Sequence, residues 1–176
     1  PSEPDWDKKK IEDFAAEIRG KLTKEIALYR YAQLMIAKCM RGAGQFPEAE
    51  KMLQGAIGSY AASSADFRKE LATLYETRAA GITDPKDTKG ANAQWGLALK
   101  EWTTLFNYAK AGVGQLKPES PPQVVKQVKS HFADAYFNLA MAYEQLGDAD
   151  KARPLWQSYI ALEPHGTWTD IARRHL

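Results

Sequence analysis

Three histidines and one cysteine are the side chains best suited to catalysis or metal binding in this chain. His131, His165 and His175 fall on different predicted elements, with no pair four residues apart and no H-E-x-x-H motif. Cys39 lies beside apolar residues of a predicted helix, and no base is placed next to it, so we expect a buried thiol. We therefore predict no catalytic residue, no metal site and no cofactor.

Acidic residues between two predicted helices offer one further candidate for ion binding. Asp84 and Asp87 resemble the start of a calcium loop, which needs oxygen ligands at alternate positions and a glutamate at its end. Pro85 and Lys86 interrupt that alternation. We interpret the segment as an ordinary surface loop.

Composition argues against nucleic acid and membranes as partners. Among 176 residues, 24 are Lys or Arg and 22 are Asp or Glu, so the net charge is only +2 and no strong single-sign field is expected. No apolar run reaches the roughly 18 residues of a membrane span, and no signal peptide is visible. The chain starts at Pro1 and stops within a predicted helix, so we interpret it as a fragment. Its compartment stays open, with the cytoplasm preferred.

Residues 133–164 carry the clearest structural pattern, which is two apolar stripes of helical period joined by a short break. The first stripe extends from Phe132 to Tyr143 with steps of three and four residues. Gly147 then allows the left-handed conformation that ends many helices. The second stripe continues to Tyr159. Because the connection is short, the two helices must fold back on each other.

This pattern resembles the tetratricopeptide repeat, which reads W-x2-L-G-x2-Y, then A-x3-F, then P. The matching residues are Tyr136, Leu139, Ala140, Tyr143, Ala152, Trp156 and Pro164. The departures are Tyr for Trp, Ala for Gly and Trp for Phe. The resemblance implies an all-α fold, a right-handed α-solenoid of helix–turn–helix hairpins with flanking terminal helices.

Degenerate copies of the pattern place the whole chain in a single domain. We expect a leading helix over residues 5–20, although Gly20 is a weak stop signal, and repeats over about 22–61, 64–111 and 122–164. The middle repeat has an insertion at 81–92 that is rich in loop-forming residues. A closing helix over 168–176 is expected to cover the last repeat.

The resemblance also implies where a partner binds, because first helices of tetratricopeptide repeats line a concave groove. Residues between the packing positions face that groove. In the middle repeat they are Lys69, Glu70, Thr73 and Glu76, and in the last repeat they include Asp134 and Gln145. The residues that we predict to bind a partner are Tyr31, Leu34, Met35, Lys38, Arg41, Phe137, Asn138, Met141 and Glu144.

Phe137 and Met141 are the apolar anchors of this prediction, and two interpretations of them stay open. They lie one turn apart on a face that the hairpin core does not need, so they suit a peptide groove. Alternatively, another segment, such as the leading helix or the insertion, covers them. The lysine, asparagine and arginine positions that grip chaperone tails are not reproduced, so that ligand is not predicted.

We therefore predict a non-enzymatic module that binds a peptide or helix of a partner protein in its concave groove. The alternative is a structural role, in which the domain docks onto other domains of its own chain or self-associates through the ends of the solenoid. Trp6 and Trp168, near the two ends of the chain, are candidates for such an interface.

Overall fold

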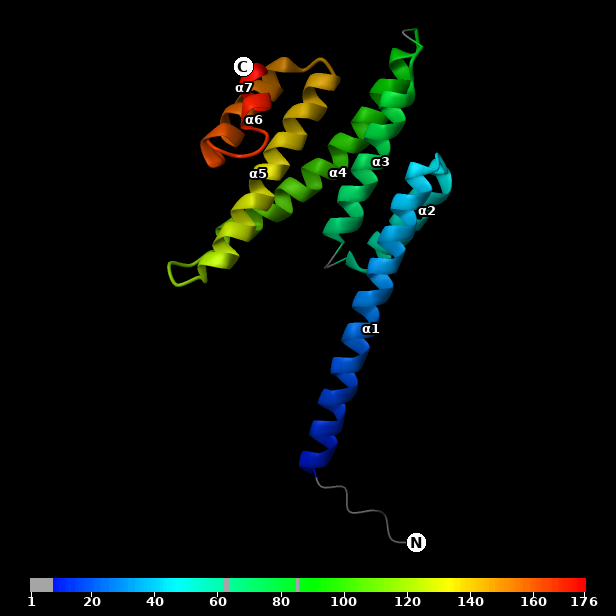
Figure 1. Cartoon of the computed structure of the whole chain (residues 1–176), viewed down its shortest axis with the longest axis vertical. Coiled ribbons are helices and arrows are strands. Elements are labelled where there is room, and N and C mark those ends of the chain that lie inside the picture. Colours follow the sequence, from blue (N-terminus) through cyan, green and yellow to red (C-terminus); the bar gives the residue numbers. More distant parts are fainter. Residues whose placement is uncertain (1–7, 62–63, 85) are drawn as a thin grey trace.

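Stacked antiparallel helices form the whole of the described structure. The computed structural model describes residues 8–61, 64–84 and 86–176, and these contain seven helices and no strand. The helices are α1 (Lys8–Gly42), α2 (Phe46–Ser59), α3 (Ala65–Gly81), α4 (Thr88–Gly114), α5 (Pro122–Gln145), α6 (Ala149–Leu162) and α7 (Thr169–Arg174). Each helix packs on the next along the chain, and α1 also contacts α3 (Figure 1). This is the all-α solenoid of helical hairpins that the sequence predicts.

The predicted leading helix and the first helix of the first repeat form one continuous helix. α1 has 35 residues and passes through Gly20 without a break. A glycine inside a helix costs only about 1 kcal/mol relative to alanine, and no proline accompanies it to stop the helix. The expected start at Asp5 lies outside the described residues, and so does Trp6.

Two equivalent turns show that the first and last hairpins are copies of one unit. Gly44 and Gly147 both adopt positive φ, at 76° and 78°. The amide after each glycine donates to a carbonyl five residues back, on Met40 and Tyr143 respectively, which satisfies carbonyls at the helix end. Small residues at matching places, Ala37 and Ala49 or Ala140 and Ala152, are fully or almost fully buried where the two helices approach. The pattern read from the sequence therefore sets the packing.

The middle hairpin accommodates its insertion by lengthening a helix rather than by a long loop. Only residues 82–87 separate α3 from α4, so the predicted insertion is helical from Thr88 onward. Asp87 caps α4, because its side chain accepts from the amide of Gly90 at 2.9 Å. A Cβ on Gly90 would lie 2.6 Å from an oxygen of Asp87, so any other residue here would require the Asp87 carboxylate to shift.

Buried side chains form two clusters that α5 connects. The first cluster contains residues of α1 to α4 together with Leu139 of α5, and the second contains residues of α5, α6 and α7. Phe106 of α4 and the pair Phe132 and Tyr136 of α5 join them, with ring centroids 4.8–5.4 Å apart. Trp156 is completely buried, as the repeat pattern requires.

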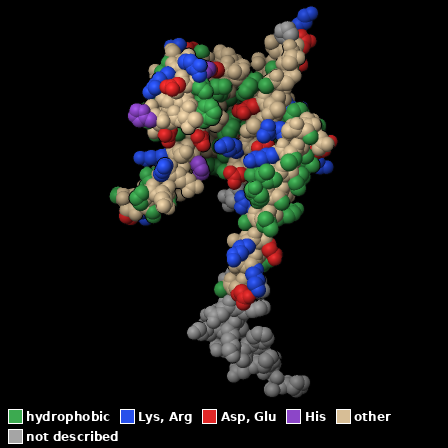
Figure 2. Space-filling model, viewed as in Figure 1, with side chains coloured by type: hydrophobic (Ala, Val, Ile, Leu, Met, Phe, Trp, Pro, Cys, Tyr) green, Lys and Arg blue, Asp and Glu red, His purple; other side chains and the backbone are tan. Residues whose placement is uncertain are grey.

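The outward surface of α1 carries many exposed apolar side chains. Leu28 and Tyr31 are 69% and 61% exposed, and hydrophobic groups gather along this helix (Figure 2). Cys39 is exposed on the same helix, so the prediction of a buried thiol is wrong. The reason is that α2 and α3 cover only one side of α1, so apolar neighbours along the helix do not ensure burial of Cys39.

Candidate functional site

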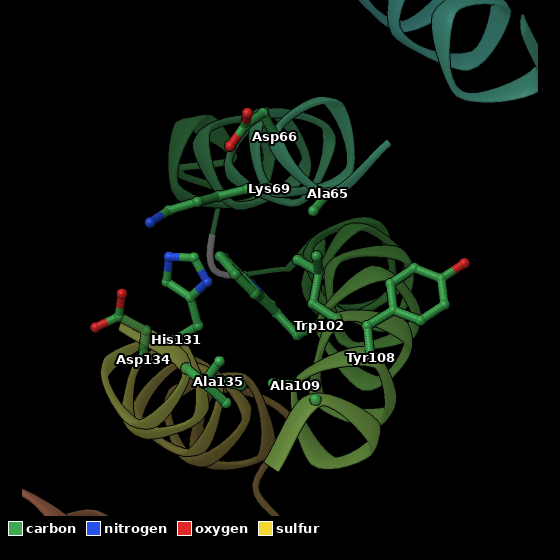
Figure 3. A pocket seen from close by; sticks show the side chains of 12 residues that line it. Ala65, Asp66, Lys69, Trp102, Tyr108, Ala109, His131, Asp134 and Ala135 are labelled. Carbon is green, nitrogen blue, oxygen red and sulfur yellow. The ribbon is translucent and has the colours of Figure 1, made fainter. Parts of the chain in front are cut away.

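A cavity of about 270 Å³ opens on the described part of the molecule where α3, α4 and α5 meet. Apolar and small side chains of α4 and α5 form most of its wall: Trp102, Leu105, Ala109, Gly112, Val128 and Ala135. Figure 3 shows these elements around the space, with Trp102 at its centre. Because α3 and α5 are the first helices of successive hairpins, the cavity lies on the face that the resemblance assigns to partners.

The spacing of the helices produces the cavity. α1 and α3, which are successive first helices, contact each other, whereas α3 and α5 contact each other less than α1 and α3 do. Instead α4 packs extensively on both of them. Alanine and glycine at positions 109, 112 and 135 leave the space between these helices unfilled. The groove is therefore widest between the middle and last hairpins.

Trp102 is held in a fixed position within this wall. It is 4% exposed, and its indole Nε1 donates to Oε1 of Glu76 at 2.6 Å. Burial raises the pKa of Glu76, while the bond from Trp102 and the charge of Arg41 lower it. Because the indole N–H already has a hydrogen-bond partner, the ring is rigid and loses little further conformational entropy when a ligand contacts it.

Four polar side chains at the edge of the cavity remain uncommitted. Asp66 and Lys69 come from α3, and His131 and Asp134 come from α5. None of these side chains makes a hydrogen bond or an ion pair within the described ranges, although the carbonyl of Asp134 accepts from Asn138. Lys69 and His131 extend toward each other across the mouth (Figure 3). These groups are therefore available to an external partner.

Carboxylates elsewhere on these helices are already engaged. Arg41 pairs with the nearly buried Glu70 at 2.6 Å, and Arg68 pairs with Glu101 at 2.7 Å. The contrast matters because a polar side chain with an internal partner would have to exchange it on binding. Asp66, Lys69, His131 and Asp134 at the cavity edge avoid that exchange.

The predicted anchors of the last hairpin pack within the molecule. Phe137 contacts the rings of Trp156, Tyr159 and Trp168, with centroids 5.0, 5.3 and 6.1 Å away, and Met141 packs against the same cluster. The alternative in which another segment covers them therefore describes the packing better. The covering segment is neither the leading helix nor the insertion but α6, with Trp168 before α7 added to it.

The other two predicted residues of that hairpin also have internal partners. The Asn138 side-chain amide donates to the Asp134 carbonyl at 2.7 Å. Glu144 accepts from the indole of Trp156 at 2.8 Å and pairs with Nδ1 of His175 at 2.7 Å. These residues serve the packing of the last hairpin and its closing helix.

The predicted residues of the first hairpin lie apart from the cavity. Tyr31, Met35 and Lys38 are exposed on α1, Leu34 packs partly against the first core cluster, and Arg41 holds Glu70. Of all the groove-facing positions read from the sequence, only Lys69 and Asp134 line the cavity. The structure does not bring the nine predicted partner-binding residues together into one site.

Sequence reasoning missed the wall of the cavity. Trp102, which belongs to the first core cluster, and His131, which is part of no metal or catalytic motif, both border the space. The available signal was the run of small residues at 109, 111 and 112 on the helix that carries Trp102. Small residues in a helix predict close packing as readily as a gap, so the signal needed the positions of α3 and α5.

Comparison with known proteins supports the helical repeat. Family models described as tetratricopeptide repeat match residues 31–63 and residues 133–165. These segments cover much of the first and last hairpins, and the hairpin α3–α4 lies between them. No match to a curated protein was found.

Two features that the described residues lack concern metal binding and membranes. These residues contain no group of three or more His, Cys, Asp or Glu side chains that could hold a metal ion. None of their helices is both long and apolar enough to cross a bilayer. What the stacked hairpins and the two family matches establish is that the chain contains tetratricopeptide repeats, at residues 31–63 and 133–165.

Proposed function

We propose that the chain is a non-enzymatic module that binds a segment of a partner protein in the cavity between α3, α4 and α5. Tetratricopeptide repeats are generally protein-interaction modules, which gives the class of function. One observation carries the finer proposal: an apolar cavity is bordered by four polar side chains without internal partners. A buried apolar centre inside a polar rim is the usual arrangement of an interaction hot spot.

A peptide selection tests this proposal with a matched pair of variants. Ala109→Phe fills the cavity from α4, whereas Ala91→Phe makes the same change at a half-buried position of α4 outside it. A displayed library of random peptides is selected on the wild-type chain, and each binder is then measured on both variants. We expect peptides whose affinity is unchanged by Ala91→Phe and falls at least tenfold with Ala109→Phe.

Two outcomes would refute the assignment of the groove. One is a library that yields no binder above background. The other is a set of binders that is indifferent to Ala109→Phe, which would place the binding surface elsewhere. Thermal melting of each variant shows whether a loss of binding reflects a loss of folding.

Self-association through α1 is a second candidate, supported by a separate observation. Large apolar side chains are exposed along this helix: Leu22, Ile26, Leu28, Tyr29, Tyr31, Met35 and Ile36. A contiguous apolar patch of this kind usually marks an interaction surface. The exposed charges between Leu22 and Ile36 are Lys24 and Glu25, which cancel, so two copies would not strongly repel each other there.

Sedimentation velocity distinguishes this second candidate. A dimer of the wild-type chain that is lost in Leu28→Glu with Met35→Glu, but kept in Leu97→Glu on α4, would support it. Leu97 is 39% exposed and serves as the control for adding a surface charge. A monomer at all concentrations would refute it and leave the groove proposal unaffected.

A further inference from the structure

We infer that the cavity takes one aromatic side chain from a peptide segment whose backbone crosses the mouth between Lys69 and Asp134. This inference rests on the proposed function, because it names the chemistry that the groove would recognise. It follows from the size of the cavity, the nature of its wall and the balance of charge at its mouth.

The size of the cavity suits a single large side chain. Small-molecule sites usually measure about 300–1,000 Å³, and this cavity is about 270 Å³. A dry cavity of about 150 Å³ is enough to bind benzene. The space therefore has room for a ring with its connecting methylene, but it is small for a cofactor or a folded element.

The wall favours an aromatic ring over an aliphatic chain. The ring of Trp102 is fixed by its bond to Glu76, and the small part of it that borders the cavity can meet an incoming ring. Ala109, Gly112 and Ala135 leave the flat space that a ring needs. Such aromatic pairs contribute about 0.5–1.5 kcal/mol beyond the burial of their area.

The mouth favours uncharged polar groups over a charged head. Lys69 provides donors, Asp134 provides acceptors, and the imidazole of His131 lies between them (Figure 3). An anion would meet the carboxylates of Asp134 and Asp66, and a cation would meet Lys69. A peptide unit carries one carbonyl and one N–H, so it can accept from Lys69 and donate to Asp134 at the same time.

Capped amino acids are the simplest probes of this preference. The indole N–H signal of Trp102, assigned with Trp102→Phe, is followed by two-dimensional NMR in the full chain. N-acetyltryptophanamide and N-acetylphenylalaninamide should shift it in a saturable way. N-acetylalaninamide, N-acetyllysinamide and N-acetylglutamic acid amide should require at least tenfold higher concentrations. Ala109→Phe should abolish the response and Ala91→Phe should preserve it.

A second cavity-filling variant covers the case in which Ala109→Phe fails to fold. A Cβ on Gly112 would meet only Cγ1 of Val128, at 3.6 Å, so Gly112→Leu can be built and should also abolish the response. Equal or stronger shifts with the charged probes would overturn the inference. So would aromatic probes that leave the Trp102 signal unchanged.

The peptide selection separates this inference from the proposed function. Cavity-dependent peptides that lack an aromatic residue would leave the function standing and refute the aromatic anchor. Conversely, aromatic probes that bind while the library yields no peptide would support the anchor and refute the function.

Discussion

A tryptophan of the second helix donates to a glutamate of the first helix in two of the three hairpins. Trp102 pairs with Glu76 and Trp156 pairs with Glu144, at equivalent positions of the middle and last repeats. In the first hairpin Leu53 replaces the tryptophan, and Arg41 stands at the position of the glutamate. The residue type at this first-helix position thus depends on the second-helix residue beside it. A glutamate stands there where an indole N–H needs an acceptor.

This pairing explains why the residue-level prediction of the groove failed at Glu144. The spacing predicts that its side chain lies off the packing stripe, on the partner-facing side of the helix. Spacing alone does not reveal that the long carboxylate reaches an indole on the adjacent helix. Spacing placed Lys69 and Asp134 on the same side of their helices, and the structure shows both side chains lining the cavity.

Phe137→Ala provides a test of the packing of the last hairpin. Truncating a fully buried phenylalanine costs about 3–5 kcal/mol, and we expect about 2–3 kcal/mol here because Phe137 is only partly buried. Tyr31→Ala, at a site 61% exposed, should change the free energy of unfolding by less than about 0.5 kcal/mol. Urea unfolding measures both. Similar values for the two variants would mean that Phe137 is not part of the core.

The Tyr75 hydroxyl gives a pH-dependent contribution to stability. It donates to Glu50 at 2.9 Å, and burial, followed by the effect of Glu50, raises the pKa of Tyr75 to about 12. In the unfolded chain the phenol loses its proton near pH 10. Between these values the folded state binds more protons, so the contribution is present below about pH 10 and is lost as pH rises toward 12.

Tyr75→Phe isolates this contribution. At pH 8 the variant should be less stable by about 1 kcal/mol, the usual value of one hydrogen bond. The difference from wild type, measured by urea unfolding, should shrink as the pH is raised from 10 toward 12. A difference that stays constant over that range would contradict a raised pKa for Tyr75.

At the scale of elements, helical period and turn chemistry were enough to predict the hairpins. The stripe from Phe132 to Tyr143, Gly147 and the stripe to Tyr159 gave α5, its turn and α6. These patterns do not predict the distance between successive first helices. The gap between α3 and α5 depends on how α4 packs against both, and no local pattern encodes that distance.

The length of α1 is the other feature that local sequence signals predicted incorrectly. At 1.5 Å per residue, its 35 residues span about 52 Å, against about 21 Å for the 14 residues of α2. Arg30 lies over the ring of Tyr60, just past the end of α2, so residues before Arg30 extend beyond their partner helix (Figure 1).

Hydrogen exchange should therefore divide α1 into two parts. Isolated helices in water are marginally stable, so we expect amides of residues 12–28 to exchange much faster than those of residues 34–41, which pack on α2. Mass spectrometry of peptic fragments measures the two segments in one experiment. Equal protection would show that the first part is covered in solution, which is the expectation of self-association through α1.

At the scale of the whole molecule, the cavity lies at the junction between the two core clusters. α4 and α5 provide its wall, and the rings of Phe106, Phe132 and Tyr136 join the same two helices nearby. A side chain that fills the cavity would add contacts across this junction. Binding should therefore stabilise the arrangement of the middle and last hairpins as well as capture the partner.

Photo-crosslinking of the tightest selected peptide tests the central claim most directly. A benzophenone residue is placed next to its aromatic residue, and the attached site on the chain is mapped by mass spectrometry. We predict attachment to residues of α3, α4 and α5 that border the cavity, which lie within residues 65–69, 102–112 and 128–135. Attachment to the outward surface of α1 around Leu28 and Met35 would contradict this account of the binding site.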